Sequence, residues 1–206
     1  ETSRIAVNGQ VTPGRLVWSF AGPDLEREPA RLENRGEEAT ELLVSVSGQP
    51  TVPEPAGGTD YAIERQMFDL NGNRIDPQAV PVNTRVAVVV TVRALSDLAG
   101  RLMVVDRIPA GLAIDNPRLV RSGDIGALDW LKTVDQPEHA QFYEDRFEVA
   151  VDQTRVSGEE LSFAYLARAV TPGEYSHPPA SVEDMYRPER RAVTDTGRFT
   201  VLGPIR

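Results

Sequence analysis

The chain has 206 residues and no cysteine, which excludes disulfides, a cysteine nucleophile and cysteine-ligated zinc. Its formal net charge of −9 argues against nucleic acid and anionic membrane surfaces as partners, because both require clustered lysine and arginine. The two histidines, His139 and His177, are too few for a histidine metal site or a Ser-His-Asp triad. The composition therefore predicts a non-catalytic protein without metal or cofactor.

The length allows one large domain or two small ones. No apolar run is long enough for a transmembrane helix, which needs about 18 residues. The sequence begins at Glu1 without methionine, and we interpret it as a processed or excised piece of a longer chain.

Short apolar alternations in residues 5–11 and 15–20 surround Asn-Gly and Pro-Gly pairs, a pattern typical of β-hairpins. Alternation and β-branched content predict a further strand over 41–47. The stretch 48–58 is dense in proline and glycine and predicts a domain boundary. We expect residues 1–52 to form a β-strand segment that adds to a neighbouring module, since its strands are too few to close a core alone.

The sequence after residue 58 consists of short strand-like runs separated by turn residues, which predicts a β-sandwich over 59–206. The predicted strands are 61–68, 85–93, 102–108, 142–151, 161–170 and 198–202. The valine-rich run 85–93 is expected to be a central strand covered on both faces, with 102–108 as its neighbour. A short helix is predicted over 124–132, where Asp124 can cap a run with apolar residues at helical spacing.

Residues 69–76, Asp-Leu-Asn-Gly-Asn-Arg-Ile-Asp, resemble part of a calcium-binding loop. Such a loop requires a bidentate glutamate at its twelfth position, which is Val80 in this chain. We therefore favour a hairpin turn with Asn71-Gly72 at its tip. Calcium binding stays open as the alternative.

The connection between the last two predicted strands, residues 174–191, contains an apolar pair, Met185 and Tyr186, in an otherwise polar sequence. Pro178, Pro179 and Pro188 stiffen this segment, because each ring fixes φ and restricts the residue before it. Spacing alone favours a pair that folds into its own core. The alternative is a pair that is presented to a partner on a stiff loop.

Two other candidates in this connection have a structural interpretation. The adjacent acids Glu183 and Asp184 would point to opposite sides of an extended segment, so they do not form an acid/base pair. We expect them to be solvated or paired with Arg187, Arg190 or Arg191. His177 is expected to form hydrogen bonds within the loop, since no second catalytic group accompanies it.

Four blocks in family order resemble the C-terminal macroglobulin-like domain of bacterial alpha-2-macroglobulins. They are Val104–Pro117, Phe142–Phe147, Phe163–Gly173 and Val182–Pro188. The Val-Asn-Gly start, Asn34-Arg-Gly36 and Gly48-Gln-Pro50 resemble the segment that precedes this domain. The resemblance implies an all-β fold, a macroglobulin-like antiparallel β-sandwich with a short helix, preceded by a small β-strand segment that completes or flanks a CUB-like module.

The resemblance also implies a function. The family comprises large periplasmic protease inhibitors, some with a lipidated N-terminus at the inner membrane, that trap an attacking protease. In many members a Cys–Gln thioester in a separate helical domain captures the protease, and the last domain covers the thioester in the resting state. The covering residues match Met185 and Tyr186. These two residues lie in a loop that corresponds to 182–188 of this chain. The residues that support the loop match Asp184, Arg187 and Pro188.

The partners implied are the thioester and CUB-like domains of the same polypeptide, the trapped proteases and other envelope proteins, with no nucleic acid and no cofactor. Two alternatives stay open. One is a β-sandwich repeat of a bacterial surface adhesin, in which Lys132 would be the lysine available for an isopeptide bond. The other is a thioester-less alpha-2-macroglobulin paralogue that acts with partner proteins.

Overall fold

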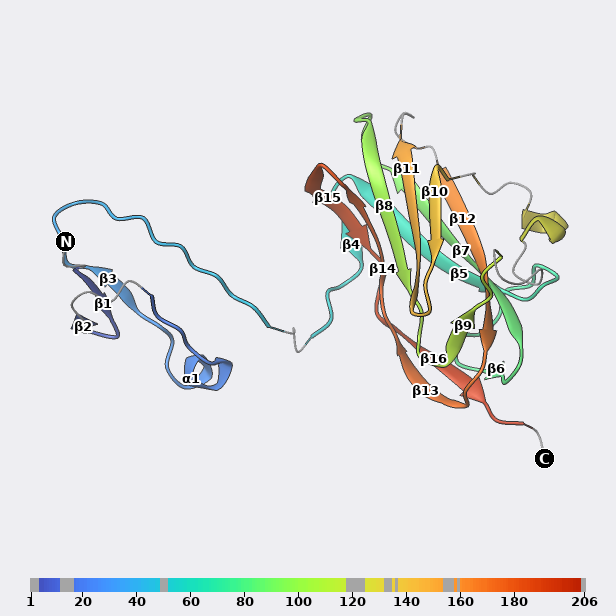
Figure 1. Ribbon diagram of the computed structural model, residues 1–206, viewed down its shortest axis with the longest axis horizontal. Helices are drawn as coiled ribbons and strands as arrows, with labels where there is room; N and C mark the ends of the chain where they lie inside the picture. Colours follow the sequence, from blue (N-terminus) through green and yellow to red (C-terminus); the bar gives the residue numbers. More distant parts are fainter. Residues whose placement is uncertain are drawn as a thin grey trace. The chain divides into compact units, whose positions relative to one another are not determined.

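The structure is a computed structural model that describes residues 4–11, 17–48, 52–117, 125–131, 135, 137–153, 158 and 160–204. The chain divides into two compact units, Glu1–Gln49 and Pro50–Arg206. Nearly all regular structure in the described residues is antiparallel β-sheet (Figure 1). Each unit is described by itself.

The first unit contains a three-stranded antiparallel sheet in the order β2-β1-β3, formed by β1 (Ile5–Val7), β2 (Gln10–Val11) and β3 (Leu32–Asn34). Asn8 and Gly9 both have positive φ, +48° and +79°, as the tight turn of a hairpin requires. The helix α1 (Gly22–Arg27) was not predicted, although Pro23 at its first turn is a favourable start.

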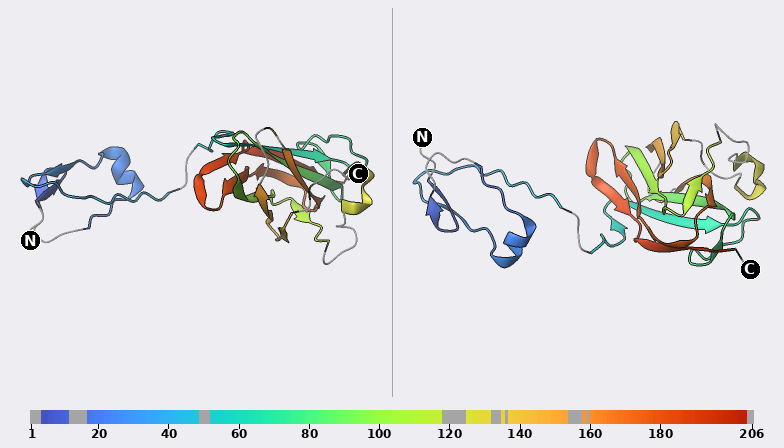
Figure 2. Two further views of the ribbon diagram at one scale, coloured as in Figure 1. Left: turned by 90° about the horizontal axis from the view of Figure 1, so that it is seen from above. Right: turned by 60° about the horizontal axis from the view of Figure 1, so that its bottom comes forward.

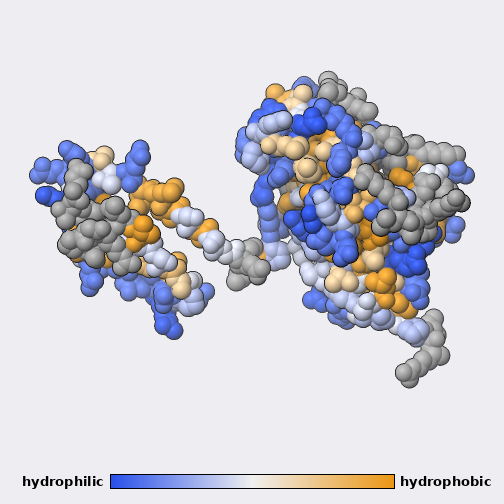
Figure 3. All heavy atoms as spheres, viewed as in Figure 1, coloured by the Kyte–Doolittle hydropathy of each residue, from blue (hydrophilic) through white to orange (hydrophobic). Residues whose placement is uncertain are grey.

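The predicted strand over 41–47 is wrong for this chain, because these residues have no regular structure. Their apolar side chains are exposed, with Leu43 at 95% and Val46 at 87%. Figure 3 shows hydrophobic residues at the surface of the first unit. Alternation marks a segment suited to a strand, but a strand also needs a neighbour for its backbone N–H and C=O groups. The described residues 17–20 likewise form no strand.

The second unit is a β-sandwich (Figures 1 and 2). One sheet has the order β5-β7-β12-β9, with β5 (Tyr61–Phe68), β7 (Arg85–Ala94), β12 (Glu160–Ala169) and β9 (Leu112–Ile114). The facing sheet has the order β10-β11-β8-β14-β15-β4, with β10 (His139–Phe142), β11 (Arg146–Gln153), β8 (Gly100–Arg107), β14 (Ala180–Asp184), β15 (Arg187–Val193) and β4 (Gly57–Gly58). A third sheet, β13-β16-β6, contains β13 (Gly173–His177), β16 (Gly197–Leu202) and β6 (Val80–Pro81). The core between the sheets is built from alternate residues of both, such as Val90, Phe163, Val104 and Val182.

β7 is a strand covered on both faces, as its valine-rich sequence predicted. Val88 and Val90 belong to the main core, whereas Ala87 belongs to a second apolar cluster with Leu131 and Leu166. The predicted neighbour is wrong, since β7 pairs with β5 and β12 while β8 pairs with β11 and β14 in the other sheet. Apolar alternation shows which face of a strand is buried but not the sheet to which it belongs.

The predicted helix over 124–132 is replaced in its described part by two short 3₁₀ helices, η2 (Ile125–Ala127) and η3 (Asp129–Leu131). Asp124 and Lys132, the expected cap and the isopeptide candidate, lie outside the described residues. Trp130 packs against Phe68 with ring centroids 5.0 Å apart and donates a hydrogen bond to the Leu70 carbonyl at 3.1 Å. This segment therefore contributes to the second apolar cluster.

Residues 69–76 form a turn. The Asp69 carboxylate accepts hydrogen bonds from the backbone N–H groups of Asn71 and Asn73 at 2.8 and 2.9 Å, and from the Asn73 side chain at 2.8 Å. The bonds from Asn73 lower the pKa of Asp69. Gly72 has φ +88° at the tip, so the favoured hairpin-turn interpretation is confirmed. Among the residues that the structure describes, no group of three or more acidic, histidine or cysteine side chains could hold a metal ion.

Candidate functional site

The stretch 174–191, predicted as a loop, is mainly strand. It contains most of β13, all of β14 and the first part of β15. β14 pairs with β8 and β15 and buries Ala180, Val182 and Asp184 on its inner face. The loop prediction failed because one of these inward positions is a carboxylate, which hides the apolar alternation. Pro188 is tolerated because the register shifts after Glu183, so Pro188 has no paired residue in β14.

Met185 and Tyr186 are the two residues that join β14 to β15, and we call them the tip pair. Met185 is 46% exposed and Tyr186 is 79% exposed. The predicted exposure is therefore confirmed, and the alternative of a pair folded into the core is wrong. Their position is the tip of a hairpin, not a loop that leaves the strand over 161–170. An exposed thioether beside an exposed aromatic ring is an apolar contact surface.

The tip is held by bonds directly beneath it. The Met185 N–H donates to the Arg101 carbonyl at 2.8 Å, and the Tyr186 N–H donates to Asp184 Oδ1 at 3.0 Å. Asp184 itself has 0% exposure, so the expectation that it is solvated is wrong. The alternative expectation is confirmed, because Asp184 Oδ2 lies 2.8 Å from Arg187 Nε and 3.4 Å from Arg190 Nη1.

A second buried ionic cluster lies where β14 begins. Arg65 Nη1 lies 2.6 Å from Asp106 Oδ1 and donates to the Pro178 carbonyl at 2.9 Å. The Tyr165 hydroxyl donates to Asp106 Oδ2 at 2.8 Å. Burial raises the pKa of Asp106, although Arg65 opposes this effect, and burial raises the pKa of Tyr165 well above its usual value. The cluster thus fixes the Pro178 turn that leads into the hairpin, and residue spacing alone did not predict it.

His177 belongs to the same region, and it lies in a strand and not in the loop where we expected it to form hydrogen bonds. It ends β13 with 4% exposure, and its ring meets Phe199 edge-on at 5.9 Å. Burial and the nearby Arg65 lower its pKa to about 3. The imidazole is therefore neutral at neutral pH and acts as a packed residue.

This burial predicts an acid-sensitive fold. The unfolded chain protonates His177 near its ordinary pKa of about 6.5, whereas the folded chain does so only near pH 3. The stabilisation is complete above pH 6.5 and is lost as the pH falls, by about 2 kcal/mol at pH 5. Urea unfolding at pH 7 and pH 5 should show that His177→Gln removes this loss and that the exposed control His139→Gln keeps it. Equal pH dependence in wild type and His177→Gln would contradict the assignment.

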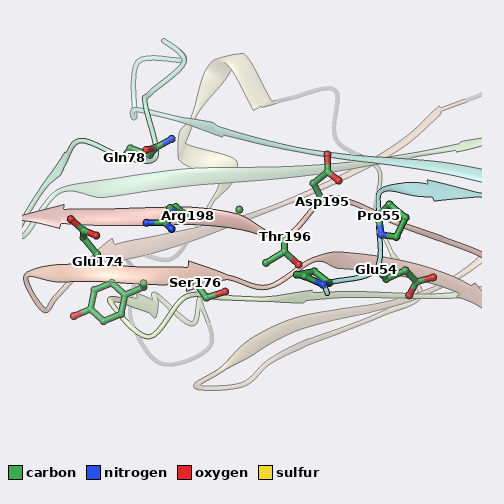
Figure 4. A pocket seen from close by; sticks show the side chains of 11 residues that line it. Glu54, Pro55, Gln78, Glu174, Ser176, Asp195, Thr196 and Arg198 are labelled. Carbon is green, nitrogen blue, oxygen red and sulfur yellow. The ribbon is translucent and has the colours of Figure 1, made fainter. Parts of the chain in front are cut away.

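A groove of about 720 Å³ lies beside the β13–β16 sheet of the second unit (Figure 4). Figure 4 shows Glu174 and Arg198 toward one end, and Glu54 and Asp195 toward the other. Its lining carries charges of both signs, whereas small-molecule sites are mostly apolar. The hydroxyl of Ser176 in this lining has no histidine beside it in the groove, so the groove offers no triad among the residues that the structure describes.

The family follows from comparison with known proteins. Residues 61–189 match the family described as the bacterial alpha-2-macroglobulin MG10 domain. The alpha-2-macroglobulin of Escherichia coli K12 is 33% identical over 187 residues, which is 84% of this chain and 11% of that protein. The chain belongs to the bacterial alpha-2-macroglobulin family, and it spans about a ninth of the length of this relative.

Solved structures agree with this assignment. Salmonella alpha-2-macroglobulin reacted with methylamine matches 76% of this chain and 10% of its own, with 32% identity and a TM-score of 0.64. Trypsin-activated E. coli alpha-2-macroglobulin matches 75% of this chain and 10% of its own, with 28% identity and a TM-score of 0.64. These matches decide against the adhesin interpretation. None of the helices in the described part of the chain is long and apolar enough to span a bilayer.

Proposed function

We propose that the second unit is a non-catalytic domain of a bacterial alpha-2-macroglobulin that acts as a protease trap, and that the tip pair covers the thioester of a neighbouring domain in the resting state. The observation that carries the proposal is the exposure of Met185 and Tyr186 at a hairpin tip held by the buried Asp184. An apolar pair exposed this way, on a rigid support, is suited to contact another surface.

The chemistry of a thioester explains why such a cover is useful. Water and amines cleave a thioester unless they are kept away from it. A polarizable thioether and an aromatic ring exclude water over a small area. Burying this pair on docking contributes about 1–3 kcal/mol, which is strong enough to favour the covered state and weak enough to be reversed when the protein changes shape.

The similar proteins give this proposal its setting. The Salmonella relative is described as reacted with methylamine and the E. coli relative as activated by trypsin. By analogy, we place the parent of this chain in the periplasm, with the thioester domain, a CUB-like domain and trapped proteases as its partners. The exposed apolar segment 41–47 supports a first unit that completes or flanks the CUB-like domain.

Photo-crosslinking in the full-length protein tests the proposal. A photoreactive benzoyl-phenylalanine at position 186 replaces one aromatic side chain by another on an exposed tip. We expect it to crosslink to the thioester-bearing domain in the resting protein and to lose this crosslink after cleavage by trypsin. The same residue at Tyr143, which is 39% exposed in the β10–β11 turn, is the matched control and should not mark that domain.

The other outcomes separate the competing functions. A crosslink at position 186 that forms only within the second unit would contradict the proposed cover, as would a crosslink that trypsin leaves unchanged. If the full-length sequence contained no Cys–Gln thioester, thioester protection would be excluded and the thioester-less alternative would apply. The membership in the family would stand in each case.

A further inference from the structure

Arg190 is a buried cation that joins the hairpin to other segments of the second unit. Its side chain is 6% exposed. Its Nη1 lies 3.4 Å from Asp184 Oδ2, and its Nη2 donates to Ser96 Oγ at 3.1 Å, in the connection between β7 and β8. The guanidinium also lies 5.3 Å from the centre of the Tyr61 ring. A guanidinium is always charged, so its burial requires anions that hold it in place.

The second anion is Asp60, whose Oδ2 lies 3.1 Å from Arg190 Nε in an ion pair. Asp60 ends the linker segment, residues 54–60, that leads from the first unit to β5. This segment lies along β15, because Gly58 in β4 pairs with Ala192 and the Thr59 N–H donates to the Arg191 carbonyl at 3.2 Å. Packing at β4 is close, since a Cβ on Gly58 would lie 2.4 Å from the Tyr61 carbonyl oxygen.

We propose that Arg190 is a positioning residue for the tip pair, which it connects through Asp184 to the linker segment at Asp60. Asp184 Oδ1 accepts the bond from the Tyr186 N–H while Oδ2 faces Arg190, so the orientation of this carboxylate sets the backbone of the tip. The other basic partner of Asp184 is Arg187, which lies closer, at 2.8 Å from Oδ2, but has a side chain that is 41% exposed. Water therefore competes for Arg187 more than for the buried Arg190.

Because Asp60 lies at the end of the linker segment, the contacts of Arg190 link movement of this segment to the tip pair during activation. Any displacement of the linker segment acts on Asp60, on Arg190 and then on the carboxylate under the tip. The inference depends on the proposed function only for the outcome of that displacement, which is exposure of the thioester. The positioning itself is a property of the 206-residue chain and can be measured there.

Amide hydrogen exchange in the 206-residue chain tests the positioning. Arg190→Gln should raise the exchange rate of the Tyr186 amide by about tenfold or more, because the acceptor of that amide loses its buried partner. Val104 and Val149 in the core report any general loss of stability, and their exchange should rise much less. Arg190→Lys keeps the charge but not the forked geometry and should restore part of the protection.

Two further variants keep the test decisive if Arg190→Gln does not fold. Asp60→Asn removes only the linker end of the connection and should raise Tyr186 exchange by about threefold, less than the effect of a whole lost bond. Arg146→Gln breaks an ion pair with Glu148 at the opposite end of β8 and should leave Tyr186 unchanged. Unchanged Tyr186 exchange, relative to the core amides, in every Arg190 and Asp60 variant that folds would overturn the inference.

The full-length protein separates this inference from the proposed function. If Tyr186→Ala and Arg190→Gln both accelerate the reaction of the thioester with methylamine, both ideas are supported. If only Tyr186→Ala does so, the tip pair is a cover that Arg190 does not position. Faster tip exchange in Arg190→Gln without faster amine reaction in either variant would keep the positioning and contradict the cover.

Discussion

Replacing Asp106 with alanine is expected to lower the free energy of unfolding of the 206-residue chain by about 3–5 kcal/mol, which is the usual cost of breaking a buried ion pair by removing one partner. Asp106 is fully buried, and the side chain of Arg65 is only 8% exposed. The alanine leaves the Arg65 charge without its carboxylate and the buried Tyr165 hydroxyl without its acceptor. Both groups then remain buried without the interaction that offsets the cost of removing them from water.

Urea unfolding at pH 7 measures this effect. Asp145→Ala is the matched control, because Asp145 pairs with Arg146 but is 71% exposed. A surface pair of this kind contributes about 0–1 kcal/mol. Asp106→Asn keeps the shape and can still accept hydrogen bonds, so its free energy of unfolding should lie between those of Asp106→Ala and Asp145→Ala. If Asp106→Ala were as stable as the Asp145 control, the cluster would not hold the β14 end of the hairpin.

Replacing Tyr186 with alanine is expected to leave the stability of the chain nearly unchanged and to change the reactivity of the full-length protein instead. The side chain is 79% exposed, so its loss leaves no cavity and changes the stability of the chain by roughly 0.5 kcal/mol or less. The control is Tyr165→Ala, since that ring is 1% exposed and packs 4.8 Å from Phe147. Removal of a buried aromatic ring costs about 3–5 kcal/mol.

The effect of Tyr186→Ala should appear in the full-length protein instead. If amines reach the thioester only when the tip pair is undocked, the rate of reaction follows the population of that undocked state. The ring supplies most of a docking energy of about 1–3 kcal/mol. Its loss should therefore accelerate amine reaction by roughly tenfold to a hundredfold.

The sequence predicted most of the sandwich because its strands follow simple apolar patterns. The runs around Val90, Val104 and Phe163 alternate or are continuously apolar, and each is a strand. Pairing was harder, since the partners of β8 are distant in sequence. Residues 41–47 show the converse case, a strand-like pattern that has no pairing partner among the residues that the structure describes.

The hairpin escaped prediction for a specific physical reason. Asp184 and Arg190 occupy inward positions of β14 and β15 as a buried ion pair, so a segment with a buried face has the composition of a solvated loop. The tip pair stood out in the sequence as an apolar pair in a polar segment, but residue spacing favoured a core position, and the resemblance to a family was needed to favour an exposed one. No pattern in the sequence indicated that Asp60 lies beside Arg190, since 130 positions separate them.

The reaction of the full-length protein with methylamine, followed by the release of the thioester thiol, tests the central claim most directly. Wild type, Tyr186→Ala and the control Tyr143→Ala would be compared before any protease is added. The proposed cover predicts slow release in wild type and in the control, and release that is roughly tenfold to a hundredfold faster in Tyr186→Ala. Equal rates in all three proteins, with a thioester present, would show that the tip pair does not cover it.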